Sequence, residues 1–168
     1  RWSCRMGVCG SCGMLVNGRP ILTCAAFVRN YSGTIRVEPL SNFPIVRDLV
    51  VDLESFIHKI KSVKPWIIRK IEKDVSEGEY RQSPEQLAEF KQYSMCINCA
   101  LCYAACPVLA AEPAFVGPAA IALGHRYNLD SRDEGNAERF DTPAKLRFLA
   151  GAKPPGQCTP NARATTWS

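Results

Sequence analysis

Eight of the nine cysteines fall in two tight groups, and this clustering constrains the chain more than any other feature. The first group is Cys4, Cys9, Cys12 and Cys24, and the second is Cys96, Cys99, Cys102 and Cys106. Secreted domains held together by disulfides are usually shorter, with an even number of cysteines spread along the chain. Because this sequence also shows no export signal, the grouped thiols predict metal binding.

The first group has the spacing C-x4-C-x2-C-x11-C, which is typical of plant-type [2Fe-2S] sites. Gly7, Gly10 and Gly13 alternate with these cysteines. Glycine accepts unusual backbone angles and lets amide groups approach the cluster sulfurs. A zinc site is the alternative, but zinc usually takes two Cys-x2-Cys pairs or adds histidine. This group has one such pair and no histidine nearby, so iron and sulfide are favoured.

The second group forms a C-x2-C-x2-C-x3-C-P run, as in bacterial ferredoxins, whose fourth cysteine serves a different cluster. The run therefore predicts that Cys96, Cys99 and Cys102 hold three corners of a [4Fe-4S] cluster, while Cys106 ligates another cluster. The remaining ligands would come from a later cysteine run. The chain offers only Cys158, which we interpret as a free thiol.

Local signals predict strands in the first part of the chain. Asn17-Gly18 lies between two apolar runs and predicts a β-hairpin of residues 14–16 and 20–24, because both turn residues must accept positive φ angles. Residues 34–37 are expected to form a further strand.

The pattern then becomes helical. Apolar residues recur every three or four positions over residues 48–63, which predicts an amphipathic helix. Residues 69–82 are polar and are interpreted as an exposed linker. Ser83 and Gln86 have capping-box spacing and predict a helix ending near Ser94. A last helix is expected over residues 117–127.

Composition limits the class of protein. Hydrophobic residues make up 46% and charged residues 22%, which excludes a wholly disordered chain. No apolar run approaches the roughly 18 residues of a membrane span. The net charge of +5 is too small to argue for nucleic acid. Residues 141–168 are rich in Ala, Pro, Gly and Thr and are expected to be poorly ordered. Since the first residue is Arg1, we expect a fragment.

Three other features receive modest interpretations. His58 lies on the predicted helix and is expected to be exposed. His125 is expected to make local contacts or to face a partner, and neither histidine is predicted to be a ligand. The apolar stretch Trp66-Ile67-Ile68 is assigned to the core in preference to a subunit interface.

Five segments resemble the iron-sulfur subunit of fumarate reductase, in the succinate dehydrogenase/fumarate reductase family. They are RWSCRMGVCGSCGM at 1–14, NGRPILTC at 17–24, NFPIVRDLVVD at 42–52, SMCINCALCYAACPV at 94–108 and GPAAIALGHRYNLDSRD at 117–133. The resemblance covers about residues 1–140 and is that of a fragment truncated at both ends. The last 28 residues are expected to lie outside it.

The resemblance implies an α+β fold. Residues 1–53 would be the C-terminal part of a plant-ferredoxin-like β-grasp domain, residues 54–140 an α-helical domain like bacterial ferredoxin, and residues 141–168 an atypical tail. It also implies three clusters: a [2Fe-2S] cluster on the first group, a [4Fe-4S] cluster held in part by Cys96, Cys99 and Cys102, and a [3Fe-4S] cluster held in part by Cys106.

The function implied by the resemblance is single-electron transfer between an FAD-containing flavoprotein subunit and quinone at one or more membrane-anchor subunits. The chain would then lie peripherally on the cytoplasmic face of the bacterial inner membrane and carry no catalytic residue of its own. Three alternatives stay open: a subunit of another flavin-linked oxidoreductase, a soluble ferredoxin-like carrier, and a truncated product without function.

Overall fold

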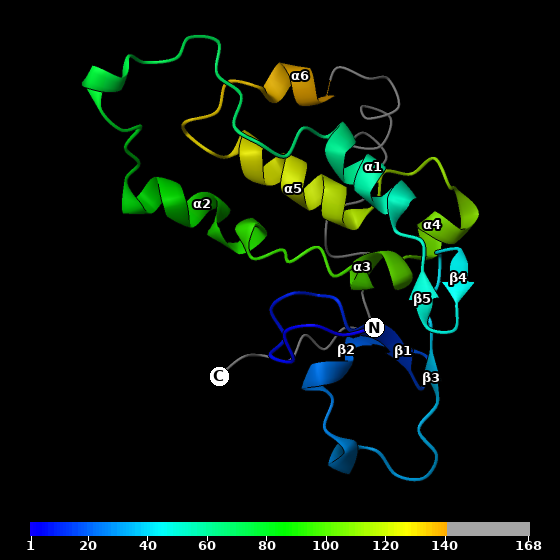
Figure 1. Cartoon of the computed structure of the whole chain (residues 1–168). Coiled ribbons are helices and arrows are strands. Elements are labelled where there is room, and N and C mark those ends of the chain that lie inside the picture. The colour runs from blue at the N-terminus through cyan, green and yellow to red at the C-terminus, as the bar shows by residue number, and fades with distance from the viewer. Residues whose placement is uncertain (141–168) are drawn as a thin grey trace.

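The computed structural model describes residues 1–140, so the expectation of a poorly ordered tail over residues 141–168 lies outside the described residues. These residues form a small β-rich part, which carries the first cysteine group, and a helical part that carries the second (Figure 1). The chain is therefore a mixed α and β protein, as expected.

The predicted hairpin is confirmed. Strands β1 (Gly13–Val16) and β2 (Arg19–Leu22) pair antiparallel around a turn in which Asn17 and Gly18 have φ angles of 49° and 75°. Strand β3 (Val37–Glu38) pairs with the other edge of β1 and is shorter than predicted. The reason lies at Arg36, whose amide donates to the Asn17 side chain at 2.8 Å instead of joining the ladder.

The predicted helix over residues 48–63 is wrong at its start. A second hairpin, β4 (Ile45–Arg47) and β5 (Val50–Val51), occupies the region, and helix α1 covers only Glu54–Ser62. The β-branched valines of β5 favour a strand over a helix. Asp52 accepts the Glu54 amide hydrogen bond at 2.8 Å, so α1 begins just after it.

The remaining helices follow the predicted order. Helix α2 begins at a capping box in which Ser83 and Gln86 exchange two hydrogen bonds, as predicted. Residues 69–82 contain only a 3-10 turn. The short α-helices α3, α4 and α6 and the 3-10 turns η1 and η2 were not predicted. The helical segments are η1 (Thr23–Ala25), η2 (Val28–Asn30), η3 (Val75–Glu77), α2 (Pro84–Ser94), α3 (Leu101–Ala104), α4 (Pro107–Ala111), α5 (Pro118–Asn128) and α6 (Asn136–Phe140).

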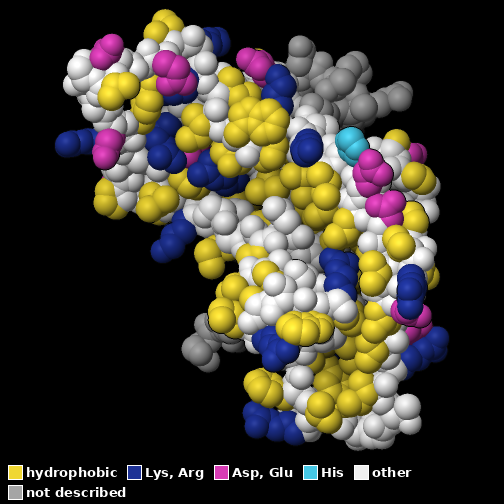
Figure 2. Space-filling model, in the orientation of Figure 1, with side chains coloured by type: hydrophobic (Ala, Val, Ile, Leu, Met, Phe, Trp, Pro, Cys, Tyr) yellow, Lys and Arg dark blue, Asp and Glu magenta, His cyan; other side chains and the backbone are white. Residues whose placement is uncertain are grey.

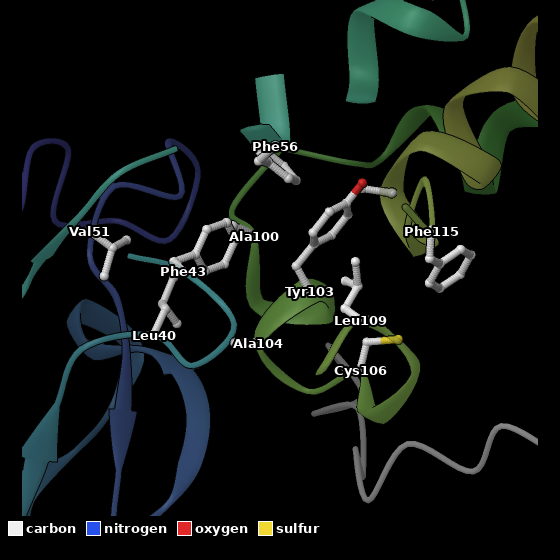
Figure 3. Close-up of a cluster of buried hydrophobic side chains, with 11 residues drawn as sticks. Leu40, Phe43, Val51, Phe56, Ala100, Tyr103, Ala104, Cys106, Leu109 and Phe115 are labelled. Carbon is white, nitrogen blue, oxygen red and sulfur yellow. The ribbon is translucent and has the colours of Figure 1, made fainter. Parts of the chain in front are cut away.

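One buried core joins the β-rich and helical parts. Leu40, Phe43 and Val51 pack with Phe56 of α1 and Tyr103 of α3 (Figure 3). The Phe56 and Tyr103 rings meet edge to face with centroids 4.7 Å apart. The first cysteine group precedes the core residues of segment 40–56 in the chain, and the second lies among the core residues around Ala100. The packing of this core therefore sets the position of one group relative to the other.

The segment around residue 66 differs from the sequence prediction. Trp66 and Ile67 are 49% and 39% exposed, so their assignment to the core is wrong. The protein contacts the backbone of this segment instead, because the Trp66 carbonyl accepts a hydrogen bond from Arg139 at 2.6 Å. Arg139 in turn pairs with Asp133. Within residues 1–140, no helix combines the length and apolar character that crossing a bilayer requires.

Candidate iron-sulfur sites

The loop before β1 is wound so that backbone amides face cysteine sulfurs. Arg5, Gly7 and Gly10 adopt left-handed φ angles of 60°, 74° and 74°. In this conformation the Gly7 amide donates to Cys24 Sγ at 3.2 Å, and the Met6 amide donates to Cys4 Sγ at 3.4 Å. Amide donors of this kind stabilise thiolate charge and tune cluster potentials.

In the first group, hydrogen bonds that shift the thiol pKa values link Cys9 with Cys4 and Cys12 with Cys24, and Cys4 also acts on the pKa of Cys24. Hydrogen bonds from Ser11, and then from Cys4, lower the pKa of Cys9 to about 6. Burial opposes ionisation of Cys12, but its hydrogen bonds with Cys24 still lower its pKa. The same contact raises the pKa of Cys24. The lowered pKa values of Cys9 and Cys12 favour the thiolate form that binds iron.

Cys12 and Cys24 are held by the predicted hairpin. Thr23 donates both its amide and its hydroxyl to the Cys12 carbonyl, at 3.1 and 3.0 Å. Cys24 follows β2 in the next turn and is thereby returned to the loop, as the sequence predicted. Cys12 is only 4% exposed, whereas Cys9 is exposed.

The second cysteine group lies on a coiled segment that leads into α3. Asn98 and Ala100 have left-handed φ angles of 52° and 64°, so the chain coils between its cysteines before α3 begins. Although Cys102 is exposed as a residue, desolvation of its thiol by the surrounding protein, together with the nearby Cys99 and Cys96 thiols, raises its pKa to about 11. Thiolates close together raise one another's pKa because their negative charges repel. A bound cation would offset this repulsion and lower the pKa values.

Cys106 immediately precedes α4. It is 6% exposed and belongs to the hydrophobic core, beside Leu109 and Phe115 on the loop between α3 and α4 (Figure 3). The side chain of Asn42 reaches across from the β-rich part and donates to the carbonyls of Tyr103 and Cys106 at 2.8 and 3.0 Å. Sequence reasoning missed Asn42, because its partners lie more than sixty positions away.

Replacing Asn42 is expected to loosen the Cys106 loop. Asn42 has a φ angle of 65°, which asparagine tolerates better than alanine. Asn42→Gly, which keeps that freedom, should destabilise the fold by roughly 1–3 kcal/mol through two unpaired carbonyls. Asn42→Ala should cost about 1 kcal/mol more. Urea unfolding of both variants measures this; equal stability of Asn42→Gly and the unsubstituted chain would contradict it.

The two groups touch at glycines. A Cβ atom added to Gly10 would lie 2.8 Å from the Cys99 Cα, and one added to Gly13 would lie 3.1 Å from the Cys99 carbonyl oxygen. The first loop therefore packs directly on the backbone of the second group. From the sequence, these glycines were expected to give the loop unusual backbone angles, and nothing in it indicated the contact with Cys99.

The donors of the first group fit a [2Fe-2S] cluster. Two thiol pairs, each with a sulfur that accepts an amide hydrogen bond, match two irons with two thiolates each. The second group presents three neighbouring thiols for a larger cluster. Among residues 1–140, no three Cys, His, Asp or Glu side chains converge on a position for a single metal ion.

Both histidines lie outside these sites. His58 is exposed and lies 3.6 Å from Glu54, as predicted. His125 of α5 packs its ring against Tyr93 of α2, with centroids 4.8 Å apart, which is a contact between two helices and not the local contact expected.

Residues 1–58 match the family described as the 2Fe-2S iron-sulfur cluster binding domain. The fumarate reductase iron-sulfur subunit of Mycobacterium tuberculosis is 59% identical over 160 residues, covering 95% of this chain and 65% of that protein. This match covers more of the chain than residues 1–140. The subunit of the same name from Haemophilus influenzae is 54% identical, covering 83% of this chain and 59% of that protein.

More distant relatives include the succinate dehydrogenase iron-sulfur subunit of Coxiella burnetii, 40% identical over 84% of this chain and 60% of that protein. A solved structure, the Mycobacterium smegmatis Sdh1 complex in the apo form, matches with a TM-score of 0.65 and 31% identity, covering 83% of this chain and 61% of the solved chain. The chain spans less than two thirds of the length of the relatives it matches. It belongs to the family of fumarate reductase and succinate dehydrogenase iron-sulfur subunits.

Proposed function

We propose that this chain is the electron-conducting part of a fumarate reductase or succinate dehydrogenase, passing single electrons between a flavin-bearing subunit and membrane quinone. The observation that carries the proposal is the arrangement of two cysteine groups in direct contact, one with its sulfurs in two pairs. The relatives' shared name, iron-sulfur subunit, supports it.

The first group would hold a [2Fe-2S] cluster, with Cys4 and Cys9 on one iron and Cys12 and Cys24 on the other. Bound there, the cluster accepts and releases one electron at a time. The chain's own contribution is to present ready thiolates, since the pKa of Cys9 is lowered to about 6. The Met6 and Gly7 amides stabilise the charge on the sulfurs.

The second group would supply Cys96, Cys99 and Cys102 to a [4Fe-4S] cluster and Cys106 to a [3Fe-4S] cluster. The burial of Cys106 in the hydrophobic core with Leu109 supports this division, because Cys99 and Cys102 do not belong to that core. Low solvent access lowers the local dielectric, which is one of the levers by which proteins set cluster potentials.

The domain description follows the same proposal. Residues 1–53 would be part of a plant-ferredoxin-like β-grasp domain and residues 54–140 a helical ferredoxin-like domain. The sheet order β2-β1-β3 beside the first group supports the former, and the short helices α3 and α4 around the second group support the latter.

The proposed partners are an FAD-containing flavoprotein and a membrane anchor that binds quinone, with the chain peripheral on the cytoplasmic face of the inner membrane. Apolar side chains exposed near the first loop support a protein partner there: Trp2, Met6 and Val8 are 65%, 69% and 58% exposed. Figure 2 shows hydrophobic surface over the β-rich lower part of the molecule, with basic side chains at its margin.

Anaerobic reconstitution of the full 168-residue chain with iron and sulfide tests the proposal. We expect iron together with labile sulfide, no zinc, and the electron paramagnetic resonance signal of a reduced [2Fe-2S] cluster. A chain that takes up zinc or no metal would contradict the proposal. A truncated product would bind iron at the first group alone, and a soluble carrier would bind it without associating with a flavoprotein subunit of a relative.

A further inference from the structure

We propose that Gly10 is a positioning residue for electron transfer: its missing side chain lets the first cysteine loop lie against the backbone of Cys99, which sets the separation of the two cluster sites. The inference rests on the proposed function, because it concerns how closely two electron-carrying sites approach. It assigns a role to a residue that ligates nothing.

Gly10 has no room for a side chain. It is buried, and a Cβ atom built on it would lie 2.8 Å from Cys99 Cα, 2.9 Å from Cys99 Cβ and 3.2 Å from Cys99 N. Real Cβ atoms essentially never approach within 3.0 Å of another heavy atom. The opposing atoms are backbone and the root of a candidate ligand, so they cannot swing aside as the end of a long side chain can.

Neither loop has freedom to retreat. On one side, the Gly10 carbonyl accepts the Gly13 amide hydrogen bond at 3.2 Å, and β1 begins at Gly13. On the other side, Ala100 is 1% exposed, and its carbonyl accepts hydrogen bonds from the Tyr103 and Ala104 amides. A side chain at position 10 would therefore push the two loops apart.

The contact between Gly10 and Cys99 lies between the two candidate cluster sites. Gly10 lies between the candidate ligands Cys9 and Cys12, and the atoms that it meets belong to Cys99, a candidate ligand of the second site. Electron transfer rates fall steeply with the distance between centres, so separation of these loops would slow transfer while leaving all ligands in place.

Three alanine substitutions separate crowding from backbone strain. Gly10→Ala introduces both, since its φ angle is +74°. Gly18→Ala introduces the same strain at φ +75° but meets nothing within 4 Å, which makes it the matched control. Gly13→Ala introduces crowding alone, because a Cβ there would lie 3.1 Å from the Cys99 carbonyl oxygen and from Leu101 Cδ2.

The first measurement is amide hydrogen exchange of the full chain, followed over residues 101–106, where the amides of Tyr103, Ala104 and Ala105 are hydrogen-bonded. Exchange there should be about tenfold faster in Gly10→Ala than in Gly18→Ala, with Gly13→Ala in between. Equal exchange in Gly10→Ala and Gly18→Ala would overturn the inference.

The second measurement is microwave power saturation of the [2Fe-2S] signal in the reconstituted chain. In the unsubstituted chain, a paramagnetic second cluster should speed relaxation of the first. Gly10→Ala should lose part of this enhancement and Gly18→Ala should keep it, at unchanged iron content. If Gly10→Ala fails to load iron, the relaxation of Gly13→Ala is compared with that of Gly18→Ala instead.

The outcomes distinguish the two claims. Uptake of zinc or no metal by the unsubstituted chain defeats the proposed function. Full loading with identical relaxation in Gly10→Ala, Gly13→Ala and Gly18→Ala overturns the positioning role alone. Iron at the first group only also overturns it, because Gly10 would then have no second centre to position.

Discussion

Replacing Cys12 by alanine is expected to abolish the paramagnetic resonance signal of the [2Fe-2S] cluster in the reconstituted chain, while Cys106→Ala leaves that signal intact. Cys12 belongs to one of the two thiol pairs and alanine carries no donor, so one iron would lose a ligand. Cys106 lies in the hydrophobic core, away from the first group.

The two variants are matched in their structural cost. Cys12 and Cys106 are 4% and 6% exposed, and each substitution removes the same sulfur atom from a buried position. Anaerobic paramagnetic resonance spectra measure the outcome, and circular dichroism reports folding. Retention of the signal in Cys12→Ala would show that Cys12 is not a ligand. Loss in both variants, with loss of helical signal, would show that the spectra follow folding and not ligation.

Arg139→Met is expected to destabilise the fold by about 3–5 kcal/mol. Arg139 is wholly buried and pairs with Asp133 at 2.5 Å; it also donates to the carbonyls of Lys64 and Trp66. Removing the guanidinium leaves a buried carboxylate and two carbonyls without their donor. Arg139 lies near the end of α6 and connects this helix to the segment after α1, so the variant should lose the contact between them.

A surface pair provides the control. Arg47 and Asp48 have side chains 85% and 82% exposed, so Arg47→Met should change stability by at most about 0.5 kcal/mol. The double variant Arg139→Met with Asp133→Asn should recover part of the loss, because no uncompensated charge remains. Urea unfolding of the metal-free chain measures all three. Equal stability of Arg139→Met and Arg47→Met would contradict the expectation.

The same pair predicts a pH dependence. Burial alone would raise the pKa of Asp133, but hydrogen bonds from Arg139 and from the Ile68 and Gly135 amides outweigh it and hold the pKa below its usual range. The stabilisation is therefore fully present above the unfolded pKa of about 3.9 and is lost as the pH falls through the lower folded value. Arg139→Met should lose that acid-side slope.

Local signals in the sequence were read correctly where the structure depends on neighbours in the chain. Asn17-Gly18 forms its turn because both residues accept positive φ angles within the hairpin itself. Ser83 and Gln86 exchange hydrogen bonds across a single helical turn. Such features need no distant partner, so residue type and spacing suffice to predict them.

The structure contradicts the sequence predictions for two apolar segments, the one before α1 and the one around Trp66. Leu49 and Leu53 fit helical spacing, yet the region up to Val51 forms a hairpin, because short apolar runs suit either structure. Trp66 and Ile67 are apolar but exposed, since Arg139 binds the backbone of this segment and not its side chains. No periodicity could show that the buried partner is an arginine more than seventy positions away.

Cysteine spacing alone predicted which thiols belong together, because a short loop can bring ligands to one cluster only if their separation along the chain is right. It also predicts that Cys106 serves a different cluster; both assignments stay predictions. The family followed from the segments around these residues. Only the tertiary structure decided how the two groups meet: at Gly10 against Cys99, on a core built from both parts of the chain. That contact joins residues almost ninety positions apart, and it depends on packing between surfaces that neither local segment specifies.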